Sequence, residues 1–186
     1  EISHLADWRT HWFRGGFPPS LLAPDEDFAR IWRQNFFKTY LERDLPLLGL
    51  RADPLLTGRL WQMTAHLSGS LLNMESLSGS LGIHGTTVRQ YLDFFESAYL
   101  VRRLQPFFTN LKKRLVKTPK IYIRDTGILH QLLGIASPLD LAGRPMLGAS
   151  WETYIIEQIA AMLPDWAEIY FYRTHQGTEA DLVITR

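Results

Sequence analysis

The sequence predicts an α+β protein in which a helical N-terminal part with a winged helix-turn-helix is followed by a smaller α/β part. Three observations lead to this expectation. Two short helices separated by glycines are predicted over 73–99, a strongly basic segment follows over 102–124, and a helix with two strands is predicted over 148–184. Helix, tight turn, helix and basic hairpin is the chain order of a winged helix.

Size and composition describe a folded globular chain. Its 186 residues are 46% hydrophobic, which is enough for one large or two small domains. Cysteine is absent, which excludes disulfides and thiolate metal sites, and the six histidines lack a paired ligand spacing. No stretch reads as a signal peptide or as an apolar run of ~20 residues, so we expect a cytoplasmic protein with no membrane partner.

Two helices joined by a turn are predicted in the first 50 residues. The first lies around Asp7, the turn covers 13–19, and the second helix covers 25–44. One stripe of the second helix should pack into the core; it contains Phe28, Ile31, Trp32, Asn35, Phe36 and Thr39. A phosphate-binding loop at the glycine pair 15–16 is disfavoured, because no Gly-Lys-Ser or Gly-Lys-Thr follows.

The predicted winged unit contains three helices. The first covers 54–67, and the second covers 73–81 with Asn73 in position to cap it. Two glycines at 82 and 85 allow the turn into the third helix, 86–99. The apolar stripe of this third helix is Val88, Tyr91, Leu92, Phe95 and Tyr99, and its outward residues near the start are Thr86, Thr87, Arg89, Gln90 and Asp93. The outward residues occupy the positions that a recognition helix uses in a DNA groove.

A cationic arm follows the third helix. Residues 102–124 contain eight basic side chains and no acidic one, interleaved with apolar residues as in strands that keep one face on a core. We therefore expect this unit to bind nucleic acid, most simply double-stranded DNA. The candidate contacts are Thr87, Arg89, Gln90, Arg103, Lys112, Lys113, Arg114, Lys117 and Lys120. Two alternatives stay open: a solvated surface hairpin, and a winged helix that docks on protein.

The last third of the chain is predicted to form a second region. A strand at 121–123 leads through Asp125 into a short helix ending at Leu133, and the proline- and glycine-rich stretch 136–145 is the expected boundary. This divides the chain into a helical region with the winged helix, 1–135, and an α/β region, 146–186. The latter should contain a helix over 148–163 and strands over 169–173 and 180–184.

Three carboxylates in this second region form a candidate metal site. Glu152 occupies an apolar stripe of its helix, and Glu179 and Asp181 share one face of the last strand. Such a set could bind Mg²⁺, which could activate water against a phosphodiester. The alternative interpretation is a solvated hairpin face, with Glu152 paired to Arg173 or capping a backbone group.

Six short motifs in a fixed order resemble the C-terminal domain of a group of prokaryotic AAA+ ATPases. They are Arg14-Gly15-Gly16-Phe17-Pro18, Leu41-Glu42-Arg43-Asp44, Val88-Arg89-Gln90-Tyr91-Leu92, Tyr122-Ile123-Arg124-Asp125-Thr126-Gly127, Gly148-Ala149-Ser150-Trp151-Glu152 and Gly177-Thr178-Glu179-Ala180-Asp181. The resemblance implies a winged helix followed by a restriction-endonuclease-like fold of the PD-(D/E)xK type, downstream of a P-loop ATPase core. It assigns the helix glutamate to Glu152 and the strand aspartate to Asp181.

The sequence departs from this pattern in two ways. No Walker A motif occurs, so ATP would bind only through an ATPase core that this chain lacks. No acid-x-Lys follows Asp181, since the last lysine is Lys120, so a nuclease site would be incomplete and this chain inactive alone. We therefore expect an accessory domain that binds nucleic acid, with a docking module for the ATPase core or another partner as the alternative and a metal-dependent nuclease as the second. The oligomeric state is left open.

Overall fold

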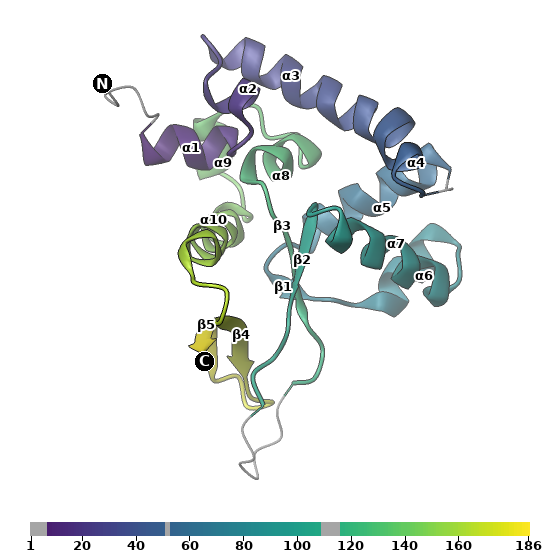
Figure 1. Ribbon diagram of the computed structural model, residues 1–186, viewed down its shortest axis with the longest axis vertical. Coiled ribbons are helices and arrows are strands. Elements are labelled where there is room, and N and C mark those ends of the chain that lie inside the picture. The colour runs from purple at the N-terminus through teal and green to yellow at the C-terminus, as the bar shows by residue number, and fades with distance from the viewer. Residues whose placement is uncertain (1–6, 51–52, 109–115) are drawn as a thin grey trace.

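The computed structural model describes residues 7–50, 53–108 and 116–186. Helices surround a small three-stranded sheet, and a helix with a hairpin extends from one end of the molecule (Figure 1). None of the described helices is both long and apolar enough to cross a membrane.

The N-terminal helices begin at residues that can cap them. Asp7 accepts a hydrogen bond from the Thr10 amide at the start of α1 (Trp8–Arg14), and Asp25 does so from Phe28 at the start of α3 (Glu26–Thr39). A short α2 (Pro18–Leu21) lies between them. Helix α3 continues through a π-helical turn, η1 (Tyr40–Asp44), into α4 (Leu45–Leu47), so the predicted helix over 25–44 is confirmed in extent.

The face that α3 buries differs from the predicted one. Phe28 and Ile31 are 51% and 50% exposed, whereas Arg33, predicted to face outward, is 2% exposed. The Arg33 guanidinium donates to Ser20 Oγ and to Glu26, and Ser20 belongs to α2. A paired arginine can be buried, so packing of α2 against α3, which periodicity does not reveal, decided the orientation.

The three helices and the hairpin of the winged helix follow in the predicted order, and a short strand that was not predicted, β1 (Ser70–Leu71), lies between the first two helices. The winged helix consists of α5 (Pro54–His66), β1, α6 (Met74–Leu81), α7 (Gly85–Ser97), β2 (Val101–Leu104) and β3 (Lys120–Ile123). Strand β3 lies between β1 and β2 and is antiparallel to both. The side chain of Asn73 caps α6, and Gly82 takes the left-handed conformation that turns the chain toward α7.

A single hydrophobic core holds the winged helix together. Its fully buried members include Trp61, Leu77, Leu92, Phe95 and Ile121, contributed by α5, α6, α7 and β3. The prediction that Tyr99 extends the apolar stripe of α7 is wrong. Helix α7 ends at Ser97, and Tyr99 is 74% exposed with a φ of 59°.

Four elements build the C-terminal region after α8 (Thr126–Leu132), which the Asp125 side chain caps. They are α9 (Pro138–Ala142), α10 (Leu147–Met162), β4 (Glu168–Arg173) and β5 (Glu179–Thr185). The predicted loop over 136–145 thus contains a helix, because Ser137 caps α9 through the Asp140 amide and a proline occupies its first turn.

The antiparallel hairpin β4–β5 is attached to the winged helix by backbone and side chains. Phe107 N–H donates to Phe171 O, and Phe171 N–H donates to Gln105 O. A small hydrophobic cluster then joins Leu104 and Tyr122 of the wing strands to Ile156 and Phe171. The division at 135/146 remains a prediction, and this cluster packs across it.

Candidate functional site

A groove separates the start of α7 from the base of the wing. Its volume is about 640 Å³, and its polar lining consists of Asn73, Glu75, Arg89, Arg103, Gln105 and Thr118. Among the predicted contacts of α7, Arg89 and Gln90 are exposed and Thr87 is half-buried, and Lys117 of the wing is exposed as well. The sequence therefore correctly indicated that this end of α7 is accessible. Lys112, Lys113 and Arg114 lie outside the described residues.

Arg103, a predicted phosphate contact, is engaged by acidic side chains of α7. Its guanidinium pairs with Asp93 at 2.7 Å and with Glu96 Oε2, and its backbone N–H donates to Glu96 Oε1 at 3.0 Å. Because β2 follows α7 after a short turn, Arg103 returns over the last turns of that helix. The pairing limits the reach of Arg103 toward a phosphate and at the same time neutralises acidic charge on α7.

Lys120 lies at the centre of a carboxylate cluster. Its Nζ is 2.9 Å from Glu152 Oε1, 2.7 Å from Glu179 Oε1 and 3.1 Å from Asp181 Oδ1, and Lys120 is 3% exposed. Tyr122, on the same face of β3, donates its hydroxyl to Glu152 Oε1 at 2.6 Å. Strand β3, helix α10 and strand β5 therefore converge on one ammonium group.

Electrostatics favour the charged form of Lys120. Burial alone would lower its pKa, but hydrogen bonds to Glu179 and Glu152 outweigh burial and leave the pKa raised. Burial, and then the hydrogen bond to Glu152, raise the pKa of Tyr122 as well, so its hydroxyl stays protonated and remains a donor. Glu152 Oε1 therefore accepts hydrogen bonds from both the Lys120 ammonium and the Tyr122 hydroxyl.

Two expectations are corrected by this cluster. Lys120 does not serve as a phosphate contact, because it is buried in ion pairs. Glu152 pairs with Lys120 instead of Arg173, while Arg173 lies 3.4 Å from Glu179. Lys120 precedes Glu152 by 32 positions and Asp181 by 61, so the sequence does not show that they are neighbours. The one local signal was the alternation that puts Lys120 and Tyr122 on the same face of their strand.

The Mg²⁺ that the three carboxylates suggested in the sequence finds a poor fit here. Carboxylates are suitable ligands, but one oxygen of Glu152, Glu179 and Asp181 is already directed at the ammonium. Across the described ranges, no group of three or more carboxylates, histidines or cysteines is arranged to hold a metal ion. The assignment of these three acids as catalytic or metal-binding groups stays a prediction.

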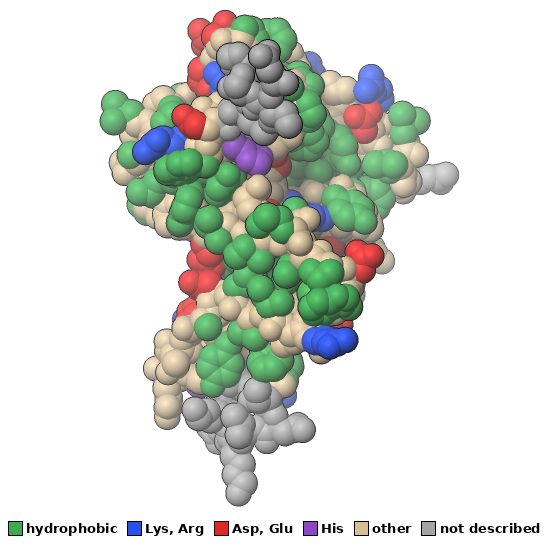
Figure 2. All heavy atoms as spheres, turned by 60° about the vertical axis from the view of Figure 1, so that its left-hand side comes forward, with side chains coloured by type: hydrophobic (Ala, Val, Ile, Leu, Met, Phe, Trp, Pro, Cys, Tyr) green, Lys and Arg blue, Asp and Glu red, His purple; other side chains and the backbone are tan. Residues whose placement is uncertain are grey.

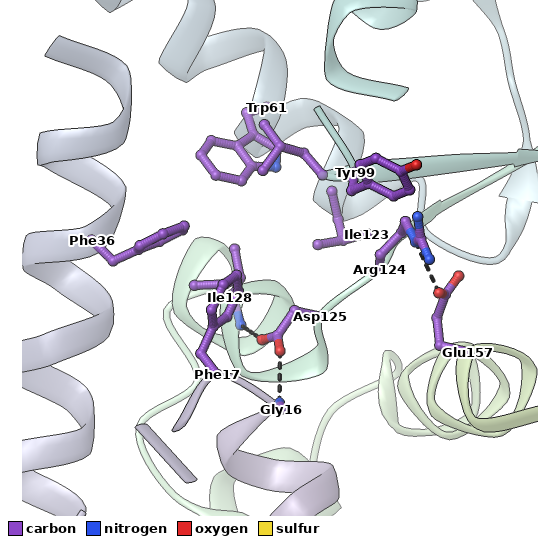
Figure 3. Close-up of a pocket in the computed structure, with 11 residues that line it drawn as sticks. Gly16, Phe17, Phe36, Trp61, Tyr99, Ile123, Arg124, Asp125, Ile128 and Glu157 are labelled. Atoms are coloured by element: carbon purple, nitrogen blue, oxygen red, sulfur yellow. Dashed lines mark hydrogen bonds and ion pairs between the residues drawn. The ribbon is translucent and has the colours of Figure 1, made fainter. Parts of the chain in front are cut away.

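Two of the quoted motifs meet at a second cavity, of about 270 Å³, which is lined by Gly16 and Phe17 of one motif and by Arg124 and Asp125 of the other (Figure 3). Asp125 accepts hydrogen bonds from Ile128 N–H and from Gly16 N–H, which ties the start of α8 to the turn after α1. Removal from water raises the pKa of Asp125, and these amides oppose that effect. At the rim, Arg124 pairs with Glu157 of α10 at 2.9 Å.

These features define the class of protein: an α+β chain built on a winged helix, with a helix and a hairpin docked on its wing strands. The chain belongs to the family described as Domain of unknown function (DUF8612), which matches residues 5–139. Residues 147–186 match a second family, Domain of unknown function (DUF4143).

Two mycobacterial proteins are similar over most of the chain. Uncharacterized protein Mb2031c of Mycobacterium bovis and Uncharacterized protein Rv2008c of Mycobacterium tuberculosis are each 46% identical over 173 residues, which is 93% of this chain and 39% of theirs. The chain therefore spans well under half the length of these relatives. Among solved structures, the crystal structure of transcriptional regulator PA3341 gives a TM-score of 0.31 at 22% identity, covering 70% of this chain and 92% of that one.

Proposed function

We propose that this protein is an accessory domain that binds double-stranded nucleic acid through the start of α7 and the wing. The observation that carries this proposal is the groove with Arg89 on its helix side and Thr118 at the wing base, beside the exposed Gln90 and Lys117. A helix that presents its first turns next to a basic hairpin is how winged helices read a groove and grip the backbone beside it.

The charge pattern supports this assignment. Acidic residues Asp93 and Glu96 would repel phosphates further along α7, but their ion pairs with Arg103 offset part of this negative charge within the domain. Arg89 and Lys117 then remain as exposed cations in the described part of this surface. The sequence contains three further basic residues, at 112–114, between β2 and β3. Such a surface binds phosphates with an affinity that falls steeply with salt.

Fluorescence anisotropy of a labelled duplex at two salt concentrations tests the proposal. Arg89→Ala should weaken binding by roughly tenfold, and Lys117→Ala should reduce the slope of log K against log salt by about 1. Arg59→Ala is the matched control, because Arg59 is an exposed arginine of α5 outside this groove. No binding at low salt, or an equal loss in the Arg59 variant, would contradict the proposal.

A second function, docking on protein, is favoured by an apolar surface on another face. Trp8 and Trp151 are 48% and 38% exposed, and both pack with Trp12. The Trp151 ring centroid lies 5.5 Å from that of Trp8 and 4.9 Å from that of Trp12. Figure 2 brings forward the left-hand side of Figure 1, which carries α1 and α10, and shows hydrophobic side chains gathered on this face. The partner we propose is the AAA+ ATPase core that the motif resemblance implies, and exposed tryptophans are typical anchors of such interfaces.

Calorimetric titration of that core, supplied as a separate chain, tests the docking function. The double variant Trp8→Ser and Trp151→Ser should lose measurable affinity while binding duplex DNA as before. Trp166→Ser is the control, since Trp166 is 61% exposed and precedes β4, away from the Trp8 cluster. Equal affinity of the double variant and the wild type would rule out this surface as the docking site.

A further inference from the structure

One buried ammonium takes the position that the motif resemblance would give to a metal ion. Lys120 Nζ contacts one oxygen from each of Glu152, Glu179 and Asp181, at 2.9, 2.7 and 3.1 Å. An ammonium group has three N–H donors and no acceptor. Three carboxylate partners therefore satisfy it completely.

We infer that Lys120 is the resident cation of this site and that it excludes divalent metal ions from the three carboxylates. The inference concerns the Lys120 cluster alone and does not depend on nucleic-acid binding. It helps to explain how three acidic side chains can converge, since repulsion among them is offset in part by a buried cation that belongs to the chain itself.

Two constraints keep Lys120 in place. Its side chain is 3% exposed and its ammonium lies 5.7 Å from the Phe171 ring centre, so it has little room to swing toward solvent. Its backbone is paired on both sides within the sheet, with Leu71 of β1 and Leu104 of β2. A tethered cation competes at a high effective concentration that a free ion must overcome.

A divalent ion would also meet unfavourable geometry and charge. Mg²⁺ requires oxygens at 2.0–2.1 Å in a near-octahedral arrangement and gives up its water reluctantly. Placed among the same oxygens, it would face the Lys120 ammonium at close range, and Arg173 lies 3.4 Å from Glu179 on the outer side. Repulsion from these two positive groups opposes the exchange.

Titration with Mn²⁺, followed by the electron paramagnetic resonance signal of the free ion, tests the inference. Wild-type protein should show no saturable site with a Kd below about 1 mM. Lys120→Met keeps an unbranched stem without the charge, and it should create one site that binds Mn²⁺ at least about tenfold more tightly. Lys38→Met is the matched control, because Lys38 is an exposed lysine of α3 outside this cluster and the variant should behave as wild type.

Thermal unfolding gives an independent readout in case removal of the charge weakens the fold. Mn²⁺ should raise the Tm of Lys120→Met, or restore its folding, and should leave the wild-type Tm unchanged. Lys120→Gln, which keeps hydrogen-bond donors, should respond in the same direction. Two results would overturn the inference. One is saturable Mn²⁺ binding to the wild type that is abolished by Asp181→Asn. The other is that Mn²⁺ neither binds nor stabilises either of the Lys120 variants.

Discussion

At the scale of single residues, His130 connects three helices through hydrogen bonds with one consistent set of donors. Trp12 Nε1 donates to Ser150 Oγ at 2.9 Å, and His130 contacts Ser150 Oγ at 2.7 Å and Phe13 O at 2.9 Å. A carbonyl only accepts and an indole only donates, so the proton lies on Nδ1 and the Ser150 hydroxyl donates to Nε2. Burial, reinforced by the charge of Arg33, lowers the pKa of His130 to about 4.

We expect this histidine to make stability depend on pH in a predictable direction. The unfolded chain takes up a proton near pH 6.5, whereas the folded one does so only near pH 4. Stability from the neutral ring is therefore fully present above pH 6.5 and is lost as the pH falls to 4, by roughly 3 kcal/mol. Urea unfolding at pH 7.5 and 4.5 measures it. His130→Gln should show a smaller loss over this interval, and an equal loss would contradict the assignment.

The residue scale also explains a positive φ outside glycine. Tyr99 has a φ of 59° and lies at the end of α7, where Arg124 stacks on its ring at 5.0 Å. A left-handed tyrosine costs on the order of 1 kcal/mol. We expect Tyr99→Gly to leave thermal stability within about 1 kcal/mol of wild type, since relief of strain offsets the lost cation–π contact. A loss well above 2 kcal/mol in calorimetry would show that the ring contributes more.

At the scale of elements, the turn after α1 and the start of α8 interlock through close backbone contact. A Cβ added at Gly127 would lie 2.0 Å from Arg14 O, and Gly15 has a φ of +79° beside the Asp125 carboxylate. The glycines of the two motifs are therefore needed for packing between segments.

Two glycine-to-alanine variants separate packing from helix propensity. Gly127→Ala must push backbone apart and should lower the free energy of unfolding by about 1–3 kcal/mol. Gly79→Ala, in α6, meets nothing within 4 Å and should raise it by about 0.5–1 kcal/mol. Chemical denaturation of both proteins gives the comparison. A neutral Gly127→Ala would mean that α1 and α8 are less tightly packed than described.

At the scale of the whole molecule, Glu157 couples α10 to the wing strands. Its carboxylate pairs with Arg102 at 2.5 Å and with Arg124 at 2.9 Å, and the Glu157 side chain is 11% exposed. Lys120 makes a second link from the same sheet to α10 and β5. The winged helix and the C-terminal helix and hairpin are thus joined by polar links on both sides of the Leu104–Phe171 cluster.

Removing the Glu157 charge should loosen this junction. Glu157→Gln leaves two half-buried arginines without an anionic partner and should cost about 2–4 kcal/mol. Hydrogen exchange should then speed up in β4 and β5 more than in α5–α7, because the hairpin depends on the junction. Glu168→Gln is the control, since the Glu168 side chain is exposed and accepts a hydrogen bond from nearby Tyr170. Uniform acceleration in both variants would contradict the coupling.

Local pattern alone was sufficient to predict most helices and strands and the order of the winged helix. The α6–α7 pair was predictable because Asn73 and Gly82 act on neighbouring backbone, and the α7 stripe because its period is regular. The buried face of α3 was not predictable, because an arginine in a helix is normally assigned to the surface. Arg33 is buried because Ser20 and Glu26 accept hydrogen bonds from it in the folded chain.

The candidate site divides in the same way. By itself the sequence determined that Glu179 and Asp181 share a strand face and that the start of α7 is polar and basic, because strand and helix periodicities are local. Only the tertiary structure decided that Lys120 belongs with these acids and that Arg103 turns back to Glu96. Charges far apart in the chain choose partners by distance in space and by the cost of burial, and neither is set until the elements pack.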